Sequence, residues 1–382
     1  MERIFVQRIQ RILRSLAFWA GATRAAFSSA SMVPVVLGGA VSAAHGTFAV
    51  GPFLLSAAGV LALHLGANLV NDYYDYASGA DVIRDSRTPF YGGGTILVEG
   101  TLSPRQVSRA YRILFAVAFL IGLVLATSRG LGVLALGLGG FLCGYFYTAP
   151  PLRLSYVGLG EATIGLCFGP LTVAGVYFAQ AGRLGAEALE ALVASIPVGL
   201  LVAAIVFVNE FPDRAADGAA GKRTLVVRLP LRTALTGYSA LVLAPFAIVA
   251  AAILLGLLPP AAALAYLALP LAALGIRNLR AAHSIPAPRL GPDTCGSPGG
   301  LEDRGSSCGL CGPRRACGPA HFIRPNGPVD PGAPGTLGAR QVPTVCGGYL
   351  APRQVAASIS TILLHLAVGL LLSLGFTLHS LR

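Results

Sequence analysis

The chain has 382 residues, of which 54% are hydrophobic and only 12% are charged, and its formal net charge is +12 at pH 7. A soluble globular domain carries about 25% charged residues, so the composition excludes an ordinary soluble enzyme. The positive charge does not indicate nucleic-acid binding, because no basic helix and no interleaving of aromatic and basic residues accompanies it. In a membrane protein, basic residues mainly set the topology and contact anionic lipid.

The apolar stretches predict an all-α, polytopic membrane protein. Residues 1–24 begin with alternating isoleucine and arginine clusters and predict a helix lying at the membrane interface. After them, each apolar stretch is near the roughly 20 residues that cross a bilayer. We expect about nine transmembrane helices, at residues 25–45, 49–71, 109–127, 130–149, 156–180, 187–208, 231–256, 259–277 and 356–378.

The arginines predict the orientation. With the N-terminus inside, nearly all of them fall in inside segments, as the positive-inside rule requires. This topology puts the polar loops 68–108 and 209–230 on the same side of the membrane, the cytoplasmic side. The expected location is the cell membrane, specifically the bacterial inner membrane, which the protein would cross several times. The membrane core would cover residues 25–283, and the last helix would lie within 356–382.

The first polar loop opens with a group of oxygen-bearing side chains. Asn68, Asp72 and Asp75 are spaced four and three residues apart, so a helix presents them on one face. Asp81 closes the stretch and joins them as a candidate metal ligand. Carboxylates at the end of a membrane helix are costly unless a cation holds them, although a solvated helix end is the simpler interpretation of either stretch alone.

The second polar loop repeats this pattern. Asn209, Asp213 and Asp217 are spaced four and four residues apart, again on one helix face. Pro212 removes a backbone donor, so we expect it to kink this helix or start a new one. Two such faces on one side of the membrane predict a divalent-metal clamp, and hard oxygen ligands with an incomplete protein shell suit Mg²⁺.

Cations follow both carboxylate clusters, and further candidate residues lie at the end of the fourth span. Arg87 and Lys222 each follow one cluster, which together with a metal predicts a site for a phosphorylated ligand. Tyr147 and Arg153 close the fourth span. The tyrosine belongs either to an interfacial aromatic belt or to a π surface that shelters a developing cation. Glu161 is an intramembrane acid, expected to orient a polar substrate or pair with an arginine.

Residues 284–355 differ in composition from the rest of the chain. The segment is rich in Gly and Pro and holds five of the chain's 7 cysteines. Cys308, Cys311, Cys317 and His321 could bind Zn²⁺ by ligand type, but their spacing fits no standard finger. A disordered insert is favoured, either natural or produced by a reading-frame slip.

These residues resemble the UbiA family of membrane prenyltransferases, within it the branch that prenylates 1,4-dihydroxy-2-naphthoate. The resemblance covers about residues 15–280 and the last span. The two Asn/Asp stretches look like the family's two Asp-rich motifs. The run from Gly221 to Thr224 and the segment from Tyr147 to Arg153 are also similar to that branch.

The resemblance implies a nine-helix bundle in which polyprenyl diphosphate binds Mg²⁺ held by the two motifs. The catalytic residues it implies are Asp72, Asp75, Asp213, Asp217 and Tyr147. The substrate-binding residues it implies are Asn68, Arg24, Arg87, Arg153, Asn209 and Lys222. The expected reaction is aromatic alkylation by an allylic cation, with 1,4-dihydroxy-2-naphthoate as acceptor in menaquinone biosynthesis. Two alternatives stay open: another acceptor, such as 4-hydroxybenzoate or homogentisate, and a cation-coupled transporter, which discontinuous helices would favour.

Overall fold

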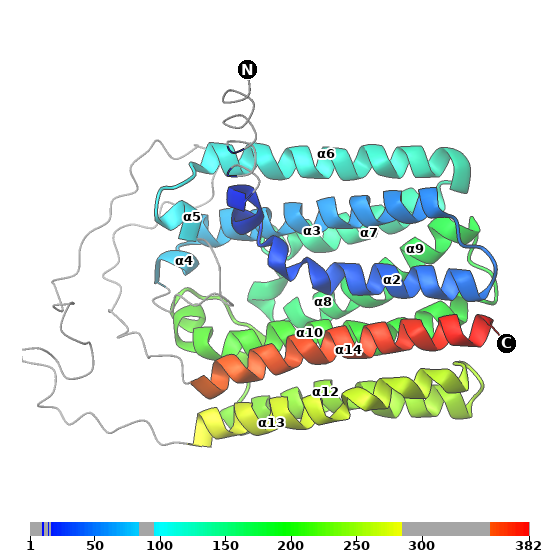
Figure 1. Ribbon diagram of the computed structural model, residues 1–382. Helices are drawn as coiled ribbons and strands as arrows, with labels where there is room; N and C mark the ends of the chain where they lie inside the picture. The colour runs from blue at the N-terminus through cyan, green and yellow to red at the C-terminus, as the bar shows by residue number, and fades with distance from the viewer. Residues whose placement is uncertain (1–9, 11–13, 15–16, 84–94, 285–351, 382) are drawn as a thin grey trace, which may run out of the picture.

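The computed structural model describes the chain except residues 1–9, 11–13, 15–16, 84–94, 285–351 and 382. The described residues form helices and turns, with no strand among them. Their long helices lie side by side in one bundle (Figure 1). The all-α fold class is therefore confirmed.

Four short helices lie at one end of the bundle or in its connections: α4 (Ala80–Ile83), α5 (Thr95–Val98), η2 (Leu154–Val157) and α11 (Leu225–Arg228). The other elements form the body of the bundle. They are η1 (Ala25–Ser28), α2 (Ser29–Ala44), α3 (Val50–Ser78), α6 (Pro104–Arg129), α7 (Gly132–Phe146), α8 (Gly160–Leu166), the π-helical turn η3 (Cys167–Leu171), α9 (Thr172–Ala181), α10 (Ala188–Ala219), α12 (Leu231–Leu254), η4 (Pro260–Ala268), α13 (Leu269–Ser284) and α14 (Pro352–Ser380).

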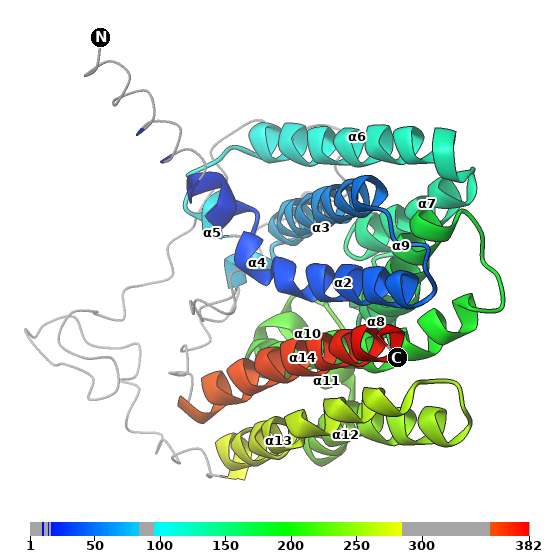
Figure 2. The ribbon, with the colours of Figure 1, turned by 45° about the vertical axis from the view of Figure 1, so that its right-hand side comes forward.

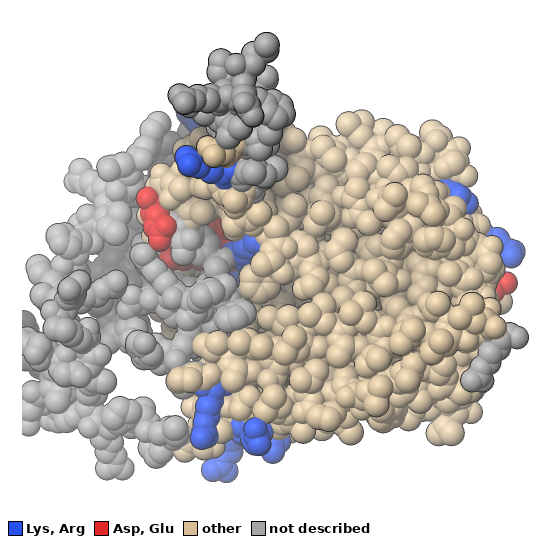
Figure 3. All heavy atoms as spheres, viewed as in Figure 1, with Lys and Arg blue, Asp and Glu red and all other residues tan. Residues whose placement is uncertain are grey.

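Eight helical stretches among the described residues are long and apolar enough to cross a membrane. Three of them are composite: η1 and α2 form one continuous stretch, α8, η3 and α9 form another, and η4 and α13 form the third. The expected fourth span is shorter than predicted: α7 has 15 residues. Figure 3 shows charged side chains at the two ends of the visible face and an uncharged band between them. The protein is a multi-pass membrane protein.

Local sequence signals set several helix ends. Ser103 and Gln106 form a reciprocal capping box at the start of α6, with Pro104 in the first turn. Gly79 ends α3 in the left-handed conformation, with φ 81°. Pro212 does not start a new helix, because α10 runs through it without a break from Ala188 to Ala219. Packing around this central helix outweighs the cost of one missing backbone hydrogen bond.

The long helices follow one another from one edge of the bundle to the opposite edge. Figures 1 and 2 both place α6 at one edge and α12 and α13 at the opposite edge. Helix α10 contributes the longest run of buried positions and packs against α12, α14 and α8. The last helix, α14, buries Leu364, Val368, Leu372 and Phe376 in this core. Gln354 Nε2, at its start, donates to the backbone carbonyl of Val208 in α10 at 2.9 Å.

One end of the bundle holds α4, α5 and the C-terminal ends of α3 and α10 (Figure 1), and we call it the polar end. Both carboxylate stretches therefore lie at the same end of the bundle, as expected. The side of the membrane that this end faces stays a prediction. The expected insert and its candidate zinc ligands fall in 285–351, outside the described residues, and α14 begins four residues before the predicted span. Most of the interfacial segment 1–24 also lies outside them.

Candidate functional site

A cavity of about 720 Å³ runs into the bundle from the polar end. Its walls come from α2, α3, α6, α7, α8, η3, α9 and α10. Its polar mouth and its apolar interior are lined by different kinds of side chain. At the mouth lie Arg24, Asn68, Asp75, Asn209, Asp213, Asp217 and Lys222; further in lie Leu63, Phe115, Leu125, Leu134 and Phe168.

The carboxylates of α3 are buried and paired with cations. Asp75 is 2% exposed, and the ammonium of Lys222 lies 3.0 Å from its Oδ2. The guanidinium of Arg24 forms an ion pair with Asp72. Asp72 itself does not line the cavity, so Arg24 stands between this carboxylate and the interior. A buried carboxylate is tolerated only when it is paired in this way.

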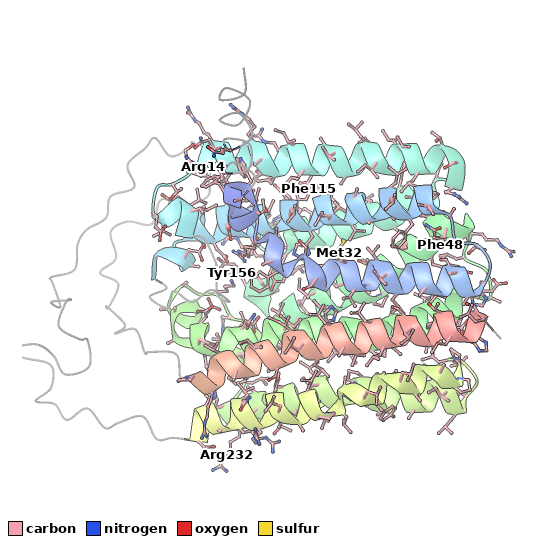
Figure 4. The ribbon with its side chains drawn as sticks, viewed as in Figure 1. Arg14, Met32, Phe48, Phe115, Tyr156 and Arg232 are labelled. Atoms are coloured by element: carbon pink, nitrogen blue, oxygen red, sulfur yellow. The ribbon has the colours of Figure 1, made fainter. Side chains whose placement is uncertain are left out.

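Two further groups hold Asp75. Tyr156 Oη donates to Asp75 Oδ1 at 2.8 Å, and Asn71 Nδ2 donates to Asp75 Oδ2 at 3.3 Å. Burial, followed by the charge of Asp75, raises the pKa of the Tyr156 phenol. The phenol therefore remains protonated and keeps donating at neutral pH. Figure 4 labels Tyr156 toward the polar end of the bundle.

The carboxylates of α10 face the same cavity. Asp213 and Asp217 are buried, and with Asn209 they line the cavity wall opposite α3. Lys222 joins the two helices, because its backbone amide donates to Asp217 O at 2.8 Å while its ammonium reaches Asp75. The structure thus brings Asn68 and Asp75 of the first cluster, all three residues of the second cluster and Lys222 to one mouth.

Arg24 and Arg153 share an unusual backbone conformation. They are the two non-glycine residues with positive φ in the part of the chain that the structure describes, at 55° and 44°. Such strain persists only where surrounding contacts fix it, and it is common at functional sites. Arg24 lines the cavity. Arg153 does not, and its guanidinium instead lies over the Tyr156 ring, 5.6 Å from the centroid.

The remaining predicted residues divide between the cavity and its surroundings. Tyr147 lines the cavity, which favours the sheltering π surface over a lipid-facing belt. Asn68 also lines it, with Nδ2 donating to Thr23 O at 3.0 Å. Asp81 is buried outside the cavity lining. Arg87 lies outside the described residues.

Three residues at the site were missed by the sequence reasoning. Tyr156 and Asn71 hold Asp75, and Glu210 is buried in the cavity wall beside Asn209. Asn71 and Glu210 had a visible signal, since each lies inside one of the two Asn/Asp stretches, whereas Tyr156 had none. Glu161 pairs with no arginine in the described structure. Its Oε1 accepts from the backbone amide of Leu225 at 3.1 Å, which fixes the segment that follows Lys222.

The donor set is compatible with Mg²⁺. Within the described residues, no three His, Cys, Asp or Glu side chains are grouped closely enough to enclose a metal ion. Carboxylate oxygens instead approach the cavity mouth from two helices. Mg²⁺ commonly takes one or two protein carboxylates and completes its shell with water and phosphate oxygens. Asp75, Asp213 and Asp217 could provide such partial shells.

Residues 31–287 match the family model described as the UbiA prenyltransferase family. The chain belongs to this family. Its relatives include the Bacillus subtilis 1,4-dihydroxy-2-naphthoate octaprenyltransferase, 28% identical over 214 residues, with 56% of this chain and 66% of that protein covered. The Gallus gallus UbiA prenyltransferase domain-containing protein 1 is 35% identical over 225 residues, covering 58% of this chain and 64% of that protein. These matches span slightly less than two thirds of each relative.

Two solved structures are also similar. A digeranylgeranylglyceryl phosphate synthase is 15% identical with a TM-score of 0.47, covering 70% of this chain and 86% of that chain. A UbiA homologue from Archaeoglobus fulgidus, described as bound to DMAPP and Mg²⁺, is 17% identical with a TM-score of 0.47, covering 62% and 78%.

Proposed function

We propose that this membrane protein transfers a polyprenyl group from polyprenyl diphosphate to an aromatic acceptor. The observation that carries the proposal is the cavity. It joins two carboxylate-bearing helix faces and a buried lysine to a long apolar interior. A polyprenyl diphosphate has the same division, with a charged head and an apolar tail. Membership in the UbiA prenyltransferase family supports this class of reaction.

The head would bind at the cavity mouth. Asp75, Asp213 and Asp217 would hold Mg²⁺, which neutralises charge on the departing diphosphate when bound. Lys222 and Arg24 already lie at this mouth and would interact with the phosphate oxygens. Asn68 and Asn209 offer amide groups from the same two helix faces. Preorganised charges at a site of developing negative charge are a large source of catalysis.

The apolar interior would hold the tail and exclude water. When the C1–O bond breaks, the diphosphate leaves with the bonding electrons and C1 becomes an allylic cation. The ring of Tyr147 lines the cavity and could shelter that cation. Exclusion of water would preserve the cation until a ring carbon of the acceptor bonds to C1.

We propose 1,4-dihydroxy-2-naphthoate as the acceptor, with loss of its carboxylate accompanying prenylation, as a step in menaquinone biosynthesis. The likeness to the Bacillus subtilis octaprenyltransferase supports this choice. Another aromatic acceptor, such as 4-hydroxybenzoate or homogentisate, is the second candidate. A cation-coupled transporter is disfavoured, because the carboxylates lie at a bundle end and α10 is continuous, whereas transporter sites form at broken helices near the midplane.

We further propose that the polar end faces the cytoplasm of a bacterial inner membrane, which the distribution of arginines supports. A membrane-impermeant thiol reagent would test this orientation. A cysteine placed at Ala219, at the polar end, should react only from the cytoplasmic side, and one placed at Leu131 only from the other side. The reverse labelling pattern would contradict the orientation.

The direct test is a transfer assay. Membranes containing the protein would receive labelled polyprenyl diphosphate and, in parallel, each of a panel of aromatic acids. Prenylated 1,4-dihydroxy-2-naphthoate is the expected product, and EDTA should abolish its formation until Mg²⁺ is restored. A product with 4-hydroxybenzoate or homogentisate alone would correct the acceptor. Absence of every prenylated product in membranes with correctly folded protein would contradict the proposed activity.

A further inference from the structure

The exposed face of α13 forms part of a second hollow in the bundle. Ala273, Arg277, Arg280 and Ser284 are spaced four, three and four residues apart, so they lie on one face of the helix. All four are exposed. With Leu243 of α12 and Arg353 of α14, they line a groove of about 710 Å³. The groove lies on α12, α13 and α14, whereas the candidate active site lies among α2, α3 and α6 to α10.

The groove is strongly basic at one end. The guanidinium groups of Arg277, Arg280 and Arg353 line it, and among the described residues no carboxylate forms an ion pair with any of them. Arg280 donates to Ser239 Oγ of α12 at 3.1 Å, which holds one guanidinium in place. Basic side chains gather at this lower corner of the polar end in Figure 3, and Figure 4 labels Arg232 there. The groove therefore presents an unneutralised site for an anion.

Toward the middle of the bundle the groove becomes apolar. Leu243 and Ile276 line it there. The same helix continues inward to Leu269, which is exposed on the bundle surface, as is Leu267 in η4. Arg280 and Leu269 are separated along the helix axis by roughly 16 Å at 1.5 Å per residue. The surface thus changes from basic to apolar along the direction in which a membrane changes from headgroup to acyl chain.

We propose that this groove binds an anionic phospholipid of the surrounding bilayer. The phosphate would interact with Arg277, Arg280 and Arg353, because guanidinium groups bind phosphate through paired hydrogen bonds. The acyl chains would lie over Leu243 and Leu269. A basic pocket between transmembrane helices is the usual form of such a lipid site. A soluble anion would use the basic end alone and would leave the apolar part of the groove uncovered.

The lipid would also join helices that are far apart in the sequence. Arg277 and Arg280 belong to α13 and Arg353 belongs to α14, which are separated by the segment 285–351. One headgroup bound by all three would hold the ends of these two helices together. Bound lipid should therefore raise the thermal stability of the protein, because a ligand that binds only the folded state stabilises it.

Binding can be tested by native mass spectrometry. The full-length protein in a mild nonionic detergent would be titrated with phosphatidylglycerol or, separately, with phosphatidylcholine. The test variant carries Arg277→Gln, Arg280→Gln and Arg353→Gln. The matched control carries Arg105→Gln, Arg109→Gln and Arg112→Gln, which remove three exposed arginines of α6 at the opposite edge of the same end. Because both variants lose the same charge, a general electrostatic effect would appear in both.

We expect the amount of bound phosphatidylglycerol to fall about tenfold or more in the α13/α14 variant, because each basic side chain near an anionic membrane contributes appreciably to binding. In the α6 variant the bound amount should stay near that of the parent. Phosphatidylcholine should be retained weakly by all three proteins. Equal losses in the two variants would overturn the proposal. So would displacement of the lipid by millimolar inorganic phosphate alone, which would show a site for a free anion. A change in oligomeric state of the α13/α14 variant with no change in bound lipid would also overturn it, because it would show an interface between copies of the chain.

A single substitution tests the same proposal if the triple variant fails to fold. Arg277 makes no hydrogen bond or ion pair with another described residue, so Arg277→Gln alone should fold normally. This single variant should still lose the stabilisation that phosphatidylglycerol gives in a thermal unfolding assay, whereas Arg105→Gln should keep it. Equal stabilisation of both single variants would also overturn the proposal.

Discussion

Lys222 and Asp75 are separated by 147 positions in the sequence, yet their side chains meet at 3.0 Å in the interior of the polar end. Both are buried, with Lys222 7% exposed. The pair joins the segment after α10 to the last turns of α3. The same two side chains line the cavity mouth, so this ion pair belongs both to the fold and to the candidate site.

Removal of the lysine should therefore affect both stability and transfer. In Lys222→Gln, Asp75 loses its cation inside the protein, and breaking a buried pair on one side costs about 3 kcal/mol or more. We expect a lower midpoint in thermal unfolding and loss of prenyl transfer. Arg223→Gln removes a neighbouring, exposed positive charge and should preserve both. A Lys222→Gln protein with parental stability and turnover would refute the role of this pair.

The carboxylates at the cavity mouth should be needed for transfer rather than for folding alone. Asp213→Asn keeps the shape of the side chain but removes the charge that would hold Mg²⁺, so turnover should fall at least a hundredfold. The Mg²⁺ concentration that gives half-maximal activity should rise in any residual activity. Glu187→Gln is the control, since the Glu187 side chain is 40% exposed and its partner is Arg183. Unchanged Mg²⁺ dependence in Asp213→Asn would exclude that residue as a ligand.

Tyr156 should position Asp75. In Tyr156→Phe the carboxylate loses one buried hydrogen bond, which costs about 1 kcal/mol, and Ser78 loses its contact with the same hydroxyl. We expect a modest fall in thermal stability and a larger fall in turnover. Tyr76→Phe, on the same helix as Asp75, has no such bond to lose in the described structure and should behave as the parent.

The same substitution should change the alkaline limit of stability. Because burial raises the pKa of Tyr156, the folded protein keeps this proton above about pH 10, where an unfolded tyrosine loses it. Stability then falls as pH rises above this value. The fall should be smaller in Tyr156→Phe than in the parent, as measured by thermal unfolding between pH 9 and 11. An identical pH dependence would argue against a buried, protonated phenol.

The depth of the cavity should set the longest tail that it accepts. Gly137 of α7 lines the cavity, and a side chain there would meet no atom within 4 Å of its Cβ. Gly137→Leu should therefore fold and fill part of the apolar interior. Transfer from long polyprenyl diphosphates should fall more than transfer from geranyl diphosphate. Gly51→Leu is the control, because Gly51 also has open space but lies away from the cavity. Equal losses with long and short donors would contradict this use of the cavity.

Much of the architecture follows from local sequence patterns. Apolar stretches predict the spans because crossing a bilayer requires a minimum length, and the spacing of Asn209, Asp213 and Asp217 predicts one face because a helix repeats every 3.6 residues. Pro212 does not start a new helix, because the packing of α10 overrides this local preference. The length of α7 was overestimated, since apolar residues continue beyond the helix into the turn after Phe146.

Contacts between residues on different elements of the bundle could not be predicted from local sequence patterns. Tyr156 reaches Asp75 from η2, 81 positions later, and its partner depends on how the connection after α7 folds back. The left-handed backbone of Arg153 turns that residue toward Tyr156 instead of the cavity, although its place in the sequence resembled a phosphate-binding position. Such contacts depend on tertiary arrangement, which residue spacing along one helix does not contain.

The hydrogen bond from Gln354 to Val208 has a consequence for how the protein is assembled. It places the start of α14 against α10, and the buried side chains of α14 continue that contact along the helix. The position of α14 is therefore set by its own packing, whatever connects it to α13. Cells that synthesise residues 1–284 and 352–382 as two separate polypeptides should still form the complete bundle. The last helix would then insert into the membrane as a separate subunit and pack against α10 in the position that it occupies in the single chain.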